Sequence, residues 1–218
     1  SAFLILFFLF NVEVPQVLFS PSNAINVSSC GTLDQNNTYY VLNQSIDALV
    51  SPCIAIIGEN ITLDGESRYL IRSLSVFLLT ADAVIVSGNN VTVKMLNLSG
   101  FLRGIVADGQ DLAIQGNHIE RFGFTSTGIS LNNVRRAIIS QNNFNPVGVG
   151  ISLTSSNFIN ITQNIFSYSA GIVMVSNSKA YISNSNNFIN TLSSLNYLFV
   201  SSSDLEIESG LVIPNNPT

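Results

Sequence analysis

Beyond residue 90 the sequence repeats itself about every 22 residues, and this repeat limits the possible folds more than any other feature. A Gly-Ile pair recurs with spacings of 24, 22 and 21 residues, at Gly104-Ile105, Gly128-Ile129, Gly150-Ile151 and Gly171-Ile172. A second phrase, apolar-x-x-Asn-x-apolar, lies between these pairs as IQGNHI, ISQNNF and ITQNIF, with a looser copy in ISNSNNF and a degenerate one in VKMLNL. A fixed period of this length is typical of a solenoid in which each repeat forms one coil.

The segments within each repeat have the character of short strands. The two GISL phrases, at 128–131 and 150–153, alternate apolar with polar residues. Gly, Asn and Ser interrupt every candidate helix. The sequence therefore predicts an all-β solenoid of about seven coils, stacked roughly 4.8 Å apart. A leucine-rich repeat is disfavoured because Ile, Val and Phe, rather than Leu, occupy the recurring positions.

Stacking the repeats predicts three rows of equivalent side chains. Ile105, Ile129, Ile151 and Ile172 form an inward core row. An asparagine ladder runs through turn positions at Asn117, Asn142, Asn164 and Asn186, where amides can bond to the coils above and below and where the residue tolerates left-handed backbone angles. Beside it runs an apolar row of Leu98, Ile119, Phe144, Phe166 and Phe188.

These features resemble the right-handed parallel β-helix repeat superfamily, which includes pectate lyases, polygalacturonases, phage tailspikes and many archaeal and bacterial secreted surface proteins. The opening CGTLDQNNTYYVLNQSI, followed by CIAIIGENITLDG with its turn at Asn60, Thr62, Leu63, Asp64 and Gly65, is similar to the first coils of the archaeal surface members. The resemblance implies a right-handed β-helix over residues 28–213, with an apolar extension at 1–27 and a tail at 214–218. It does not by itself imply a function.

Cysteine usage and sequons indicate an extracellular or cell-surface protein. Cys30 and Cys53 are the two cysteines, and we expect them to form a disulfide that staples the first coil. Seven Asn-x-Ser/Thr sequons are glycosylation candidates: Asn26, Asn36, Asn43, Asn60, Asn90, Asn97 and Asn160. Only 10% of the residues are charged, and Asn and Ser supply much of the polarity.

The sequence begins with SAFLILFFLF, an apolar run that must be buried against a partner or removed by processing. Its large apolar side chains are Phe3, Leu4, Ile5, Leu6, Phe7, Phe8 and Phe10. The run is too short to span a bilayer, which requires about 20 residues. It suits a strand donated to a neighbouring subunit. A signal-peptide remnant and a local cap or membrane anchor stay open as alternatives.

A search for chemistry yields one weak candidate. His118 and Glu120 would share an outer face, near Arg121, Asp108 and Asp111, but no second carboxylate stacks over them, so we interpret them as solvated surface. Asp64-Gly65 and Asp108-Gly109 are expected to be turns. No metal site or cofactor is expected from two Met, two Cys and one His. A net charge of −5 without a basic stripe disfavours nucleic acid as a partner.

Three functions remain, and the first is favoured. The chain is interpreted as the structural subunit of an extracellular filament or surface assembly, in which copies of itself join head to tail through the N-terminal strand. The first alternative is a non-catalytic β-helix that binds surface polysaccharide or mediates adhesion through exposed Tyr and Phe. The second is a carbohydrate-active lyase or hydrolase, which we disfavour because no catalytic constellation is found.

Overall fold

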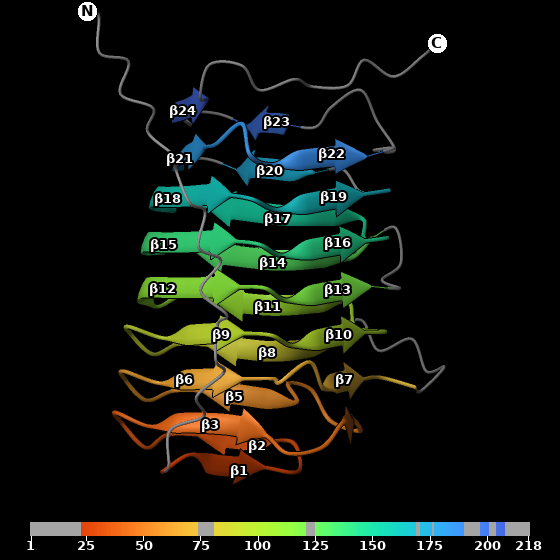
Figure 1. Cartoon of the computed structure of the whole chain (residues 1–218). Helices are drawn as coiled ribbons and strands as arrows, with labels where there is room; N and C mark the ends of the chain where they lie inside the picture. The colour runs from red at the N-terminus through yellow and green to blue at the C-terminus, as the bar shows by residue number, and fades with distance from the viewer. Residues whose placement is uncertain are drawn as a thin grey trace, which may run out of the picture.

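The fold is an all-β parallel solenoid, seen in a computed structural model that describes residues 23–73, 81–120, 125–168, 171–175, 177–189, 197–200 and 204–207. Every strand pairing is parallel, and the coils stack in chain order, with β1 at one end and β24 at the other (Figure 1). This confirms the predicted solenoid. The N-terminal residues Phe3 to Phe10 and the 214–218 tail lie outside the described residues.

Three parallel sheets form the walls of the solenoid. The nine-stranded sheet contains β1 (Ile25–Val27), β3 (Tyr39–Leu42), β6 (Thr62–Asp64), β9 (Thr92–Lys94), β12 (Gln110–Gln115), β15 (Arg135–Ser140), β18 (Asn157–Thr162), β21 (Lys179–Ile182) and β24 (Asp204–Ile207). The eight-stranded sheet contains β2 (Gly31–Leu33), β5 (Ile54–Ile56), β8 (Asp82–Val86), β11 (Arg103–Ala107), β14 (Thr127–Asn132), β17 (Val149–Thr154), β20 (Ile172–Val175) and β23 (Tyr197–Val200). The seven-stranded sheet contains β4 (Ile46–Asp47), β7 (Tyr69–Ile71), β10 (Asn97–Ser99), β13 (His118–Glu120), β16 (Asn143–Asn145), β19 (Ile165–Ser167) and β22 (Asn187–Ile189).

The strand β1 shows that the solenoid begins earlier than the sequence suggests. It lies inside the segment 1–27 that we expected to be an extension, and it pairs with β3 through Ile25 and Tyr40. Its side chains alternate between the two faces as in an ordinary strand, since Asn26 is exposed and Val27 is buried. None of the described residues belongs to a helix long and apolar enough to cross a membrane.

The core is a continuous apolar column enclosed by the three sheets. The Gly-Ile row lies in register, with Ile105 opposite Ile129, Ile129 opposite Ile151 and Ile151 opposite Ile172, and all four side chains are buried. On the seven-stranded sheet, Phe144, Phe166 and Phe188 form a phenylalanine stack. Their ring centroids are 4.8 Å apart at each step, with interplanar angles of 5° and 7°. Stacking like upon like keeps the core packed from coil to coil.

The asparagine ladder is buried inside the corner between the nine-stranded and seven-stranded sheets. The Oδ1 of Asn142 accepts hydrogen bonds from the backbone N–H and the side-chain amide of Asn117, at 3.0 and 2.9 Å. The same two contacts join Asn142 to Asn164 and Asn164 to Asn186. Each Nδ2 also donates to a backbone carbonyl of the preceding coil, such as Ile114 O for Asn142. The ladder therefore satisfies backbone groups that the turn leaves without strand partners.

The left-handed backbone angles lie one residue before the ladder, which corrects our expectation. Gly116, Gln141 and Gln163 have φ values of 63°, 58° and 56°, and they directly precede Asn117, Asn142 and Asn164. The sharp turn is made by the preceding residue, so that the asparagine side chain can point inward. A second buried ladder was missed: Ser156 Oγ accepts from the Val134 N–H, and Ser178 Oγ accepts from the Ser156 N–H, both at 3.2 Å.

The first coils are held together by a disulfide and by an ion pair that involves a buried carboxylate. The predicted Cys30–Cys53 disulfide is present and links the residues that precede β2 and β5. The phrase expected to be a turn at 60–65 contains strand β6, and its Asp64 is buried. Asp64 accepts a hydrogen bond from the Tyr39 hydroxyl and lies 3.0 Å from Lys94 Nζ on the next coil. The expected turn thus places a structural carboxylate between coils.

These contacts set the ionisation of Asp64. Burial acts to raise the pKa of Asp64, but hydrogen bonds from Tyr39, the Glu66 backbone N–H and Lys94 outweigh it and hold that pKa below its usual value. Burial together with the hydrogen bond to Asp64 raises the pKa of Tyr39. The carboxylate is therefore charged under neutral conditions and binds both neighbours.

Candidate functional site

The outer face of the nine-stranded sheet carries an irregularity that recurs in three coils. Asp111, Arg136 and Phe158 are the second residues of β12, β15 and β18, and their φ values are 56°, 63° and 60°. Such angles are uncommon for residues other than Gly, and a bulky residue that adopts them marks a turn or a functional constraint. The conformation turns two consecutive side chains outward, where an ordinary strand would alternate.

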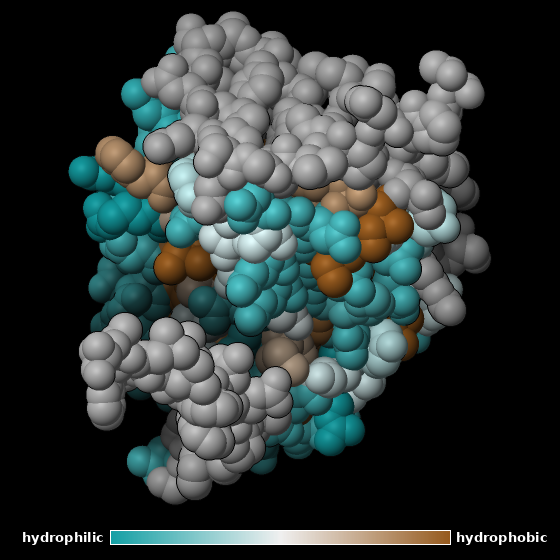
Figure 2. Space-filling view, turned by 45° about the horizontal axis from the view of Figure 1, so that its top comes forward, coloured by the Kyte–Doolittle hydropathy of each residue, from teal (hydrophilic) through white to brown (hydrophobic). Residues whose placement is uncertain are grey.

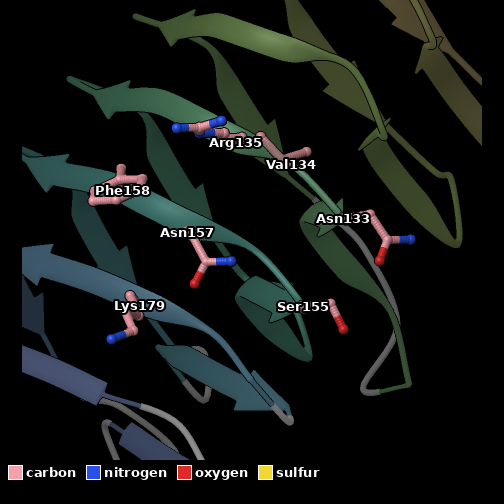
Figure 3. Close-up of a pocket in the computed structure, with 7 residues that line it drawn as sticks. All are labelled: Asn133, Val134, Arg135, Ser155, Asn157, Phe158 and Lys179. Atoms are coloured by element: carbon pink, nitrogen blue, oxygen red, sulfur yellow. The ribbon is translucent and has the colours of Figure 1, made fainter.

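Arg135 and the outward pair Asn157 and Phe158 form part of the wall of a shallow pocket, which we name the Arg135 pocket. Its volume is about 300 Å³, and it is lined by Asn133, Val134, Arg135, Ser155, Asn157, Phe158 and Lys179. Figure 3 shows Arg135, Asn157 and Lys179 on three successive strands, with Phe158 beside them and with Asn133 and Ser155 at the turns. The pocket therefore combines cationic, amide, hydroxyl and aromatic side chains from neighbouring coils.

Phe158 is the most exposed ring of this face. Its side chain is 65% exposed, and the Arg135 guanidinium lies 5.9 Å from its ring centroid. A cation at this distance from an aromatic ring is attracted to the face of the ring. Because both residues sit on paired strands, with Arg135 opposite Asn157, their relative positions are fixed by the sheet rather than by a loop.

A second pocket adjoins the first, and Phe158 lines both. This Asn160 pocket has a volume of about 480 Å³ and is lined by Asn90, Thr92, Asp111, Leu112, Ala113, Arg136, Ala137, Ile138, Phe158 and Asn160. Its hydrogen-bonding character comes from the Arg136 guanidinium, which binds both carboxylate oxygens of Asp111. Asn160 Oδ1 is buried without a hydrogen-bond partner, so it is not exposed to the pocket. The hydrogen bonds from Arg136 lower the pKa of Asp111, so this pair carries two compensating charges.

The candidate pair His118 and Glu120 lies on the seven-stranded sheet, away from these pockets. His118 Nε2 and Glu120 Oε2 are 3.1 Å apart, and both residues are partly buried. On the adjacent coils they face Asn97 and Ser99 on one side and Asn143 and Asn145 on the other. Arg121 lies outside the described residues, whereas Asp108 is exposed after β11 and Asp111 is bound to Arg136. Within the described ranges, no three His, Cys, Asp or Glu side chains are close enough to hold a metal ion.

The seven sequons differ in accessibility. The side chains of Asn26, Asn36, Asn43, Asn60 and Asn90 are exposed, whereas Asn97 and Asn160 are partly buried. Asn97 donates its amide to the Ser67 carbonyl at 2.5 Å. Asn60 and Asn90 form an outer row with Asn37, in which each amide donates to the preceding Oδ1. Two sequon residues, Asn90 and Asn160, line the Asn160 pocket.

Figure 2 shows hydrophilic residues over most of the described surface in that view, with hydrophobic residues in small separate patches. Comparisons with protein families, with curated proteins and with solved structures gave no match to this chain.

Sequence reasoning found the stacked rows but missed both pockets. The signal was present, because the inward residues Val134 and Ala137 are three positions apart instead of two, as are Ser156 and Ile159. Two outward residues between inward ones indicate a local break in alternation. Which outward residues of different coils come together depends on the register of the strands. The register places Arg135 opposite Asn157 and brings the ring of Phe158 close to Arg135.

Proposed function

We propose that this protein is a non-catalytic, extracellular β-helix that binds polysaccharide on the outer face of β15, β18 and β21. The observation that carries the proposal is the Arg135 pocket, in which a 65% exposed Phe158 ring is surrounded by amide, hydroxyl and cationic side chains. A sugar presents apolar C–H faces and a rim of hydroxyl groups. An aromatic ring with adjacent hydrogen-bonding groups matches both features.

The scaffold supports this proposal. Arg135, Asn157, Phe158 and Lys179 lie on strands of three successive coils, so binding would require little reordering of the backbone around them. A shallow, open surface suits a polymer that continues beyond the site, whereas an enclosed cavity suits a small molecule. The disulfide between Cys30 and Cys53 is compatible with an extracellular location.

The test is a binding experiment on the full chain with a panel of soluble polysaccharides, followed by analysis of the products. We expect retention without cleavage, and we expect Phe158→Ala to weaken retention at least about tenfold. Tyr168→Ala is the matched control, because Tyr168 is also an exposed aromatic residue with a positive φ, of 54°, but lies after β19 on the seven-stranded side. Equal losses for the two variants, or cleavage of the polysaccharide, would contradict the proposal.

A filament subunit is the second candidate, favoured by the arrangement of the first two coils. Among the described strands, β1, β2 and β4 are each the terminal strand of a sheet. A terminal strand presents backbone groups that can pair with a strand from another subunit. We expect that removal of residues 1–12 abolishes any filaments that the full chain forms, as seen by negative-stain microscopy. Filaments of the truncated chain would contradict the role of the N-terminal segment.

A further inference from the structure

We propose, on the basis of the polysaccharide-binding function above, that the ligand is an acidic polysaccharide whose carboxylate or sulfate ester binds to Arg135. The shared chemistry of these substituents is a negatively charged oxygen cluster on a sugar ring. A guanidinium binds such a cluster through two parallel N–H donors.

The argument begins with how the chain uses its other cationic side chains. Three of them pair with a carboxylate on the preceding coil: Lys94 with Asp64, Arg103 with Asp82 and Arg136 with Asp111. Within the described part of the chain, no carboxylate lies within ion-pair distance of Arg135. Its guanidinium instead lies over the exposed ring of Phe158. Arg135 is therefore placed differently from the cations that hold the coils together.

The lining of the Arg135 pocket contains cationic side chains although the whole chain is acidic. It contains two cationic side chains, Arg135 and Lys179, and no carboxylate, while the chain as a whole carries a net charge of −5. In the adjoining pocket, the charge of Asp111 is compensated by Arg136. Lys179 lies opposite Asp204 on the next strand, so Arg135 is the cation that a ligand would use, and its guanidinium in a lining without carboxylates attracts an anionic group.

The contact with Phe158 defines how the sugar would lie. The guanidinium carbon lies 5.9 Å from the ring centroid, so the N–H donors of Arg135 are close to any group that packs on Phe158. A sugar ring that packs on Phe158 would bring its acidic substituent beside those donors. The bound sugar would thus make an apolar contact and a charge-assisted contact at once.

The Asn160 pocket extends the site for a neighbouring, uncharged sugar. Because Phe158 lines both pockets, a polymer can pass from one to the other across this ring. Arg136 and Asp111 line this pocket, and their polar atoms can exchange hydrogen bonds with sugar hydroxyls. A glycan attached to Asn160 would occupy this pocket, which makes the unmodified protein the binding form.

The experiment uses three polymers with one backbone: dextran, carboxymethyl dextran and dextran sulfate. Binding to the full, unglycosylated chain is measured by calorimetry at low and at moderate salt. We expect at least one acidic polymer to bind about tenfold more tightly than dextran, with an affinity that falls as salt rises. The two acidic arms decide between a carboxylate and a sulfate ester as the preferred group.

Two arginine variants separate a specific site from overall charge. Arg135→Gln should remove most of the preference for the acidic polymer over dextran. Arg68→Gln is the matched control, because Arg68 is an exposed arginine between β6 and β7, and it should retain the preference. Circular dichroism melts establish that both variants are folded.

The outcomes are distinguishable. If no polymer binds, the polysaccharide-binding function fails, and this inference fails with it. If dextran binds as tightly as its acidic derivatives, the binding function stands and the assignment to an acidic ligand is overturned. Equal effects of the two arginine variants, or equally tight binding of a single-stranded oligonucleotide, would overturn the role of Arg135 in recognising an acidic sugar.

Discussion

Replacing Asn142 by Ala should destabilise the solenoid strongly, although the change removes only a few atoms. Asn142 is fully buried and takes part in four side-chain hydrogen bonds. Its Oδ1 accepts from the backbone N–H and the Nδ2 of Asn117, and its Nδ2 donates to Ile114 O and to Asn164 Oδ1. Alanine at this position removes all four of these hydrogen bonds at once.

The size of the effect follows from which groups keep another partner. Asn117 Nδ2 still donates to Val93 O at 3.1 Å, and Asn164 Oδ1 still accepts from the Asn142 N–H at 3.0 Å. The Asn117 backbone N–H loses its only side-chain acceptor in a buried position, which costs about 1–3 kcal/mol. The three other lost hydrogen bonds cost about 1 kcal/mol each. We therefore expect a loss of roughly 4–6 kcal/mol, a large share of the stability of a typical domain.

Urea unfolding followed by far-ultraviolet circular dichroism measures this loss, since the chain has no tryptophan. Asn145→Ala is the control, because Asn145 lies on the same coil but on the outer face of β16, where it is only partly buried. It should change the free energy of unfolding by no more than about 0.5 kcal/mol. If the two variants unfold at the same urea concentration, the asparagine ladder does not contribute as argued.

Three further changes test the packing, the cross-link and the charge of the stack. Gly150→Ala should lower the free energy of unfolding in urea by about 1–3 kcal/mol, because the added Cβ would lie 2.6 Å from a ring of the phenylalanine stack. Gly31→Ala is the control and should be neutral, because its added Cβ meets no atom within 4 Å. Reducing Cys30–Cys53 should lower stability by roughly 3 kcal/mol from the loss of loop closure; unchanged melting after reduction and alkylation would contradict this. Because the folded-state pKa of Asp64 is lowered, the carboxylate stabilises the fold above about pH 4, and this contribution is lost as the pH falls further. Asp64→Asn should flatten this part of the plot of stability against pH. An unchanged plot would refute the stabilising role of Asp64.

The repeat alone determined the solenoid, its inward Ile row and the order of the asparagine ladder. Each of these depends on the spacing of similar residues along the chain. When the coils stack, residues that are one period apart come into contact. The disulfide was also predictable, because its cysteines are separated by 23 residues, close to one coil. Such features need no knowledge of how the turns are shaped.

The tertiary structure decided what the turns and bulges do with individual side chains. Asp64 looked like part of a turn but is a buried carboxylate, because its partner Lys94 lies one coil away. The left-handed residues precede the ladder asparagines instead of coinciding with them. Period alone does not specify backbone angles within a coil.

The candidate site also depends on features that the repeat alone does not predict. The sequence contains Arg135 and Phe158 as ordinary surface residues, 23 positions apart. Positive φ angles at Arg136 and Phe158 turn consecutive side chains outward, and the register of β15 with β18 brings the guanidinium over the ring. The sequence thus determined the stack, because stacking depends on period, whereas only the tertiary structure decided the binding face, because that face depends on local departures from the period.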